Sequence, residues 1–197
     1  MQQNNKFFKS ATLALFAASV FATGNASAKQ NSVDFTASIN TSEVSSITPF
    51  CASQQAGIGH GSGLTTLFSP SPSLPSPSNE IFQASLSSSD CVVPAAAGKG
   101  GLPPYIDFGP GVFTLMGAGG DSIFAVYNGR LTLDQQLLLV PGSAPTYNFD
   151  TSTTFQVVGG TGRYEKAKGN GTIRGTEVMT GIGTSTGSLK ATGHISY

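Results

Sequence analysis

Alternation of apolar and polar side chains is the feature of this sequence that most constrains its fold. Val33 to Asn40 alternates strictly, and so does Phe82 to Ser87. Side chains two positions apart lie on the same face of a strand, so this period predicts half-buried β-strands. We expect about eight strands, at 33–40, 82–87, 111–116, 122–128, 131–139, 147–158, 170–180 and 186–197. Their number and spacing indicate an all-β domain, either a barrel or a sandwich.

Two polar residues are expected to face the interior. Asn128-Gly129 favours a tight hairpin turn, after which Leu131, Leu133, Leu137 and Leu139 share one face with Gln135 among them. In 170–180 the alternation places Glu177 inward, beside Ile173. Burial raises the pKa of a carboxyl group, so Glu177 is a candidate acid, base or ligand-binding group. The alternatives are that both residues lie in solvent at a mouth, or that a bulge reverses the alternation.

The first 28 residues have the pattern of a secretory signal peptide. Lys6 and Lys9 precede an apolar run, Ala11 to Ala22, and Ala26-Ser27-Ala28 supplies the small residues of a cleavage site. A run of this length is too short to span a bilayer, and no later run is longer, so we expect no membrane-spanning segment. The sequence thus predicts secretion or a periplasmic location, and a single domain at 29–197.

Charge and composition exclude several partners. Removing the signal leaves two fewer basic than acidic residues, so we expect no binding to nucleic acid, which requires a clustered basic field. No group of residues has metal-ligand spacing, and no cofactor is predicted. A Ser- and Pro-rich stretch at 69–79 predicts an exposed loop within the domain.

Cys51 and Cys91 are the two cysteines of the chain. An exported protein meets an oxidising compartment, where such a pair usually bonds, so we expect a disulfide. A metal site or a reactive thiol is the alternative. Neither cysteine belongs to a CxxC motif, which argues against structural zinc.

A glycine-rich stretch at 157–175 could be mistaken for a nucleotide-binding loop. It lacks the Walker run of Gly, Lys and Ser or Thr, and Glu165 stands where a dinucleotide fingerprint needs its third glycine. The segment that follows alternates as a strand, so a phosphate would have no helix terminus on which to bind. The stretch is therefore expected to be a turn between strands.

This turn resembles the GGTGRF-x-x-A-x-G signature of the allene oxide cyclase and dirigent-like β-barrel family, in particular small secreted bacterial proteins with an allene oxide cyclase barrel-like domain. The matching positions are Gly159, Gly160, Thr161, Gly162, Arg163, Tyr164, Ala167 and Gly169. The resemblance implies a closed eight-stranded antiparallel barrel of the calycin type, and a homotrimer, because the plant members are trimers. The catalytic residues of the family have no match here, so the motif predicts fold and not activity.

Three functions remain open at this stage. The first is non-catalytic binding of a small hydrophobic molecule or a partner protein by an exported barrel, since eight strands can enclose one small ligand. The second is an isomerase or cyclase acting on an apolar intermediate in the lumen. The third is a cell-surface or matrix protein. No catalytic set can be assembled from the sequence, which favours the first.

Overall fold

The computed structural model describes residues 32–53, 55–68, 79–98 and 100–197. The expected signal peptide at 1–28 and residues 69–78 of the expected loop lie outside the described residues. Within the described part of the chain, no helix is both long and apolar enough to cross a membrane.

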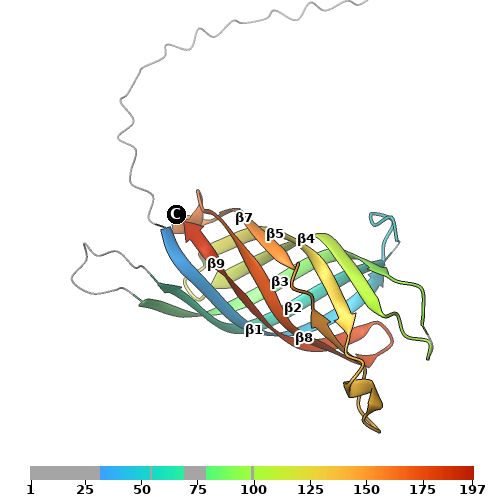
Figure 1. Cartoon of the computed structure of the whole chain (residues 1–197). Helices are drawn as coiled ribbons and strands as arrows, with labels where there is room; N and C mark the ends of the chain where they lie inside the picture. The colour runs from blue at the N-terminus through green and yellow to red at the C-terminus, as the bar shows by residue number, and fades with distance from the viewer. Residues whose placement is uncertain (1–31, 54, 69–78, 99) are drawn as a thin grey trace, which may run out of the picture.

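The structure is an antiparallel sheet of nine strands with two short 3-10 helices (Figure 1). The strands are β1 (Ser32–Ile47), β2 (Gln55–Phe68), β3 (Asn79–Pro94), β4 (Tyr105–Gly117), β5 (Ser122–Leu133), β6 (Thr146–Phe149), β7 (Thr154–Gly160), β8 (Lys168–Gly181) and β9 (Thr184–Ser196). The helices are η1 (Leu137–Leu139) and η2 (Gly162–Tyr164). The prediction of an all-β chain is confirmed for the described residues.

The sheet closes on itself through a ring of eight strands. The order around it is β1, β2, β3, β4, β5, β7, β8 and β9, and β9 pairs again with β1. The short β6 lies between β5 and β8 beyond the end of β7, so β6 and β7 share one position of the ring. Closure leaves only short stretches of strand edge unpaired, which protects a β-rich chain from association through its edges.

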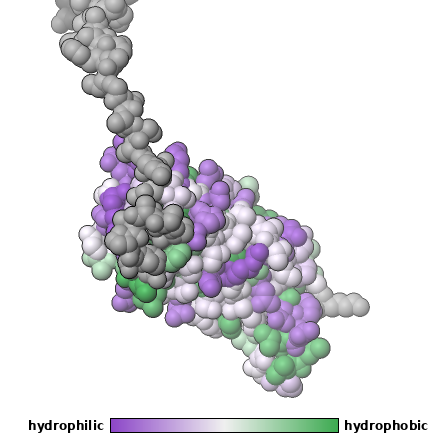
Figure 2. All heavy atoms as spheres, turned by 60° about the vertical axis from the view of Figure 1, so that its left-hand side comes forward, coloured by the Kyte–Doolittle hydropathy of each residue, from purple (hydrophilic) through white to green (hydrophobic). Residues whose placement is uncertain are grey.

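Most of the buried side chains are apolar, as alternation predicts. In β1 the buried side chains are Val33, Phe35, Ala37 and Ile39, each between exposed or half-buried neighbours. Phe35, Phe113 and Phe155 pack edge to face near the middle, with ring centroids 5.9 Å apart in both contacts of Phe155. The outer surface seen in Figure 2 is mostly hydrophilic or of intermediate hydropathy, with separate apolar patches near its ends.

The glycine-rich turn packs one end of the ring. Tyr164 is 1% exposed and contacts Tyr197, the residue after the last strand, with ring centroids 4.9 Å apart. Gly162 has φ +57°, a conformation that favours glycine, and a Cβ there would also displace the carboxylate of Asp121. Arg163 lies over the ring of Tyr164 and forms an ion pair with Glu80. The stretch is thus a turn between strands, as expected, and Tyr164 fills this end of the ring.

The predicted hairpin at Asn128-Gly129 is wrong. β5 runs through both residues to Leu133, and then leaves the sheet. Gly129 is needed for a different reason, because a Cβ there would lie 2.3 Å from Oγ1 of Thr153 and 2.8 Å from the Phe108 ring. Its absence of a side chain lets a neighbouring loop and an aromatic ring approach the strand.

Two further differences offset each other in the strand count. The expected strand at 131–139 ends at Leu133, and Leu137–Leu139 forms an exposed 3-10 turn. Conversely, β2 was not predicted, because glycines at 57, 59, 61 and 63 occupy one set of alternate positions and leave no apolar period. The expected segment 147–158 is divided into β6 and β7 by a turn.

The expected disulfide is confirmed. Cys51, in the connection between β1 and β2, is bonded to Cys91 on β3. Cys91 pairs with Ala56, and the next pair along is Asp90 with Gly57. The disulfide therefore ties the β1–β2 connection to β3 immediately beside Asp90.

Candidate functional site

A cavity lies inside the ring, toward the end opposite the Tyr164 turn. The centre of a water molecule can occupy a volume of about 70 Å³ inside this cavity. All the space between the surrounding atoms, part of which is open to solvent, amounts to about 820 Å³. Phe35, Ala37, Ile39 and Ala191 line its apolar part. Val33, Tyr164 and Ile195 at the other end belong to the packed core and do not line it. The ring is therefore filled at one end and hollow toward the other.

The glycines of β2 help to keep this end hollow. Gly57 and Gly59 are buried positions on the inward face of the strand and contribute no side chain. A Cβ at Gly59 would lie 2.4 Å from Oγ of Ser88, which is on the neighbouring β3. The space that side chains of β2 would fill is thus taken by groups from β1 and β3.

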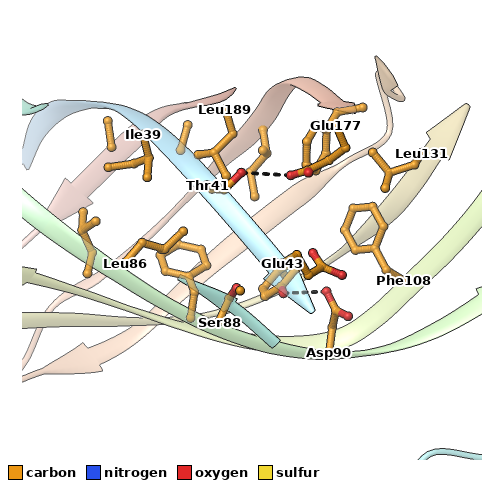
Figure 3. A pocket seen from close by; sticks show the side chains of 18 of the residues that line it. Ile39, Thr41, Glu43, Leu86, Ser88, Asp90, Phe108, Leu131, Glu177 and Leu189 are labelled. Atoms are coloured by element: carbon orange, nitrogen blue, oxygen red, sulfur yellow. Dashed lines mark hydrogen bonds between the residues drawn. The ribbon is translucent and has the colours of Figure 1, made fainter. Parts of the chain in front are cut away.

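Three acidic side chains, which we call the carboxyl cluster, gather in the wall of this cavity: Glu43 of β1, Asp90 of β3 and Glu177 of β8 (Figure 3). Each continues the inward alternation of its strand. In Figure 3, Glu43 and Asp90 lie close together on one side, and Glu177 reaches inward from the other. The cluster thus draws on strands that lie far apart in the sequence.

Glu177 is the most buried member, with 4% of its surface exposed. The hydroxyl of Thr41 donates a hydrogen bond to its Oε1 at 3.0 Å, whereas its buried Oε2 has no hydrogen-bond partner among the described residues. Gly187 is its cross-strand partner, and a Cβ there would lie 2.6 Å from the Glu177 carboxyl group. The opposing glycine therefore leaves the room that this inward carboxyl group occupies.

Glu43 and Asp90 converge over Gly57. A Cβ at that glycine would lie 2.3 Å from Oε1 of Glu43 and 2.8 Å from Oδ1 of Asp90. On the other side of Asp90, the hydroxyl of Tyr127 donates a 2.6 Å hydrogen bond to Oδ2. Two carboxyl groups and a phenol are thus held together above a backbone position that only glycine leaves open.

Burial makes these groups weak acids. Desolvation, together with the charges of Asp90 and Glu177, raises the pKa of Glu43 to about 8. Desolvation also raises the pKa of Asp90 to about 6, against the opposing hydrogen bond from Tyr127. The pKa of Glu177 is raised by burial, with the hydroxyls of Ser185 and Thr41 opposing the rise. Near neutral pH the cluster therefore combines groups that hold a proton with groups that can accept one.

The arrangement is suited to binding a polar group or moving a proton beside an apolar surface. Carboxyl groups with separated pKa values are the usual acid and base pair of enzymes that work near neutral pH. Among the described residues, no group of three or more His, Cys, Asp or Glu side chains has the geometry of a metal site.

The residues expected from the sequence fall into three places. Glu177 lies in the cavity wall, on the face that alternation assigns to it. Gln135 was expected in the interior, but it lies exposed in the turn after β5, because the strand ends at Leu133. The eight residues of the turn motif lie at or beside the closed end, away from the cavity.

Glu43, Asp90 and Tyr127 were missed by the sequence reasoning, although a signal was present. The alternation of Val33 to Ile39 continues without a break through Thr41 to Glu43. That of Ala84 and Leu86 continues through Ser88 to Asp90. Extending each strand by four residues would have found both carboxyl groups.

Comparisons with protein-family models, curated protein sequences and solved structures find no match to this chain. The resemblance to the allene oxide cyclase and dirigent-like family therefore stays a prediction based on its turn motif.

Proposed function

We propose that this chain is an exported ligand-binding protein that holds one small, mainly apolar molecule inside its ring of strands, without changing it chemically. The observation that carries this proposal is the cavity itself, which is apolar over most of its wall and polar at the carboxyl cluster. Binding sites for small molecules commonly combine an apolar lining with a few polar groups that fix orientation.

Export is supported by the disulfide, since such bonds persist in oxidising compartments, and by the signal-like N-terminal sequence. We also infer a calycin-type barrel of the allene oxide cyclase and dirigent-like family. The closed ring of eight antiparallel strands and the packing of Tyr164 in the turn motif support that inference. A purely structural surface protein is less favoured, because its interior would have no need of a cavity with a carboxyl cluster.

Filling the cavity tests ligand binding. Ala37 and Ala191 are cross-strand partners in the cavity wall, so Ala37→Leu should occupy the space of a ligand. We expect Ala37→Leu to weaken calorimetric binding of hexan-1-ol by about tenfold or more, because overlap of even a few atoms costs more than 1 kcal/mol. Ser38→Leu is the matched control, since Ser38 is the adjacent, outward-facing residue of β1.

Unchanged binding by a folded Ala37→Leu variant would contradict the proposal. If that variant does not fold, Ala191→Val fills less of the same space and serves the same test. Native mass spectrometry of protein isolated from its source would then identify the natural ligand by its mass.

A second function, proton-transfer catalysis by an isomerase or cyclase, is favoured by one specific observation. Glu43 and Asp90, with pKa values raised to about 8 and about 6, lie beside each other in the cavity wall. Such a pair could protonate and deprotonate an apolar substrate. If this is the function, Asp90→Asn should abolish turnover of the identified ligand while leaving its binding within a few-fold of the original, whereas a pure binding protein shows no turnover before or after the change.

A further inference from the structure

We propose that the ligand carries a primary ammonium group, which binds within the carboxyl cluster while its apolar body extends toward Phe35 and Ala191. This inference rests on the proposed function and specifies the chemical class of the molecule bound at the same site. It is carried by the unpartnered oxygen of Glu177, by the charge of the cavity wall and by the aromatic rings beside the cluster.

The clearest sign of a missing partner is Oε2 of Glu177. The residue is 4% exposed and directed into the cavity, yet this oxygen has no hydrogen-bond partner among the described residues (Figure 3). Oδ1 of Asp90 is likewise buried without a partner. Such an oxygen loses its water, and the groups beside it, Ser185 for Glu177 and the backbone of Gly57 for Asp90, replace that water only in part, which is rare in native interiors. An ammonium group has three N–H donors and no acceptor, so it is the complement of carboxyl oxygens that lack donors.

The sign of charge in the wall fits a cation. Among the described residues that line the cavity, three are acidic and none is basic. The nearby arginines have other partners on the outside, since Arg130 pairs with Asp107 and Arg174 donates to the backbone oxygen of Asp150. No basic residue in the described part of the cavity wall therefore neutralises the cluster, and a carboxylate or phosphate ligand would be repelled by it.

The protonation of the carboxyl cluster also favours a cationic ligand. Burial, and then the charges of Asp90 and Glu177, raise the pKa of Glu43, and the remaining titratable neighbours are phenols. Tyr127 of β5 donates to Asp90, and Tyr147 of β6, opposite Glu177, donates to the carbonyl of Pro103. A bound ammonium group would lower all three carboxyl pKa values, because an opposite charge favours the ionised form. Binding near pH 7 should therefore release a proton, mainly from Glu43.

Aromatic rings next to the cluster suit the same group. Phe108 packs against Tyr127 and Phe149, with ring centroids 5.9 and 5.8 Å apart, and all three residues line the cavity. The faces of such rings attract ammonium groups. The remaining space, about 70 Å³ for water centres, holds about five to seven waters at the 10 to 15 Å³ that each needs. A slender chain of about six heavy atoms therefore fits better than a ring system.

Three probes of equal length test this inference: hexylamine, hexan-1-ol and hexanoate, titrated calorimetrically into the full domain at pH 8.5. We expect hexylamine to bind about tenfold or more tightly than hexan-1-ol, and hexanoate not to bind detectably. At pH 7, titrations of hexylamine in buffers of different ionisation enthalpy should show release of a proton on binding.

Variants separate the carboxyl cluster from general effects of charge. Glu177→Gln should remove most of the preference for hexylamine over hexan-1-ol. Glu165→Gln, an exposed carboxyl group in the turn before β8, should leave that preference unchanged. If Glu177→Gln does not fold, Glu43→Gln tests the same preference and should also abolish the proton release.

The outcomes distinguish the two proposals. If hexan-1-ol binds as tightly as hexylamine, or if hexanoate binds best, the ammonium inference is overturned and the apolar binding function stands. If the three probes all fail to bind, both are overturned. Preferential binding of hexylamine that survives in Glu177→Gln and in Glu43→Gln would place the ammonium group elsewhere and also overturn the inference.

Discussion

The hydroxyl of Tyr127 on β5 donates a 2.6 Å hydrogen bond to Asp90 on β3, inside a cavity that contains two further carboxyl groups. β3 and β5 are separated in the ring by β4, so this bond spans a whole strand. Oδ2 of Asp90 is thus the acceptor from Tyr127, while Oδ1 lies beside Gly57.

Removing this donor should raise the pKa of Asp90 and lower the free energy of unfolding. In Tyr127→Phe the pKa of Asp90 should rise above about 6, because the hydrogen bond that stabilises the carboxylate is lost while burial remains. The free energy of unfolding at pH 8 should fall by about 1.5 kcal/mol or more, the usual contribution of a hydrogen bond to a charged group. Carboxyl-carbon NMR titration and urea unfolding measure the two effects. Tyr105→Phe, which changes a tyrosine on the outside under Arg130, should leave Asp90 unaltered.

Stability should fall as the pH rises from about 4 to about 8. Glu43 and Asp90 titrate near 8 and 6 in the folded chain, above their ordinary values of 4.5 and 3.8. Between those limits the folded state binds more protons than the unfolded state, so raising the pH favours unfolding. Each group contributes a slope of at most about 1.4 kcal/mol per pH unit.

Urea unfolding at pH 5 and pH 8 measures this slope. Glu43→Gln should flatten it, and Glu165→Gln should not. A stability that increases over this range in the unmodified chain would mean that the cluster is not buried as described.

Two buried tyrosines should respond oppositely to loss of the hydroxyl. Tyr147 and Tyr164 are each 1% exposed, but the hydroxyl of Tyr147 donates to the carbonyl of Pro103 at 3.0 Å. That of Tyr164 has no partner in the described part of the chain. Tyr147→Phe should therefore lower the free energy of unfolding by about 1 kcal/mol, and Tyr164→Phe should leave it unchanged or raise it. Thermal unfolding of the pair side by side measures the difference, and equal losses would contradict the packing described at the closed end.

The disulfide should contribute a large share of the stability. Cys51 and Cys91 are 40 residues apart, and closing such a loop restricts the unfolded chain by about 4 kcal/mol. A reducing agent should therefore lower the urea concentration at the midpoint of unfolding, in proportion to this loss of stability. The variant with both cysteines changed to serine should start at that lower midpoint and show no further response to the reducing agent.

The sequence predicted a strand well only where its inward positions carry side chains. Alternation in 170–180 is unbroken, so the inward position of Glu177 could be inferred correctly. β2 could not, because its inward positions at the hollow end are glycines, and an absent side chain has no hydropathy to alternate. The same glycines help to create the cavity. The residues that form the site therefore gave no hydropathy signal from which the cavity could be predicted.

Local turn signals were overruled by packing elsewhere. Asn128-Gly129 lies within a continuous strand because Thr153 and Phe108 occupy the space over Gly129. Leucines 137 to 139 keep a strand-like pattern after the chain has left the sheet, which is why Gln135 was misplaced. Thr153 and Phe108 are both more than 20 residues from Gly129, so no short window of sequence contains these contacts.

The central claim, that a small apolar molecule binds inside the ring, is tested most directly by methyl NMR with hexan-1-ol as the probe. We expect saturable shifts of the methyl groups of Ile39, Leu86 and Leu115 in the cavity wall, with Ile47, Leu139 and Ile182 on the outside unaffected. Shifts confined to the exposed methyl groups, or no saturable shift in the cavity wall, would contradict it.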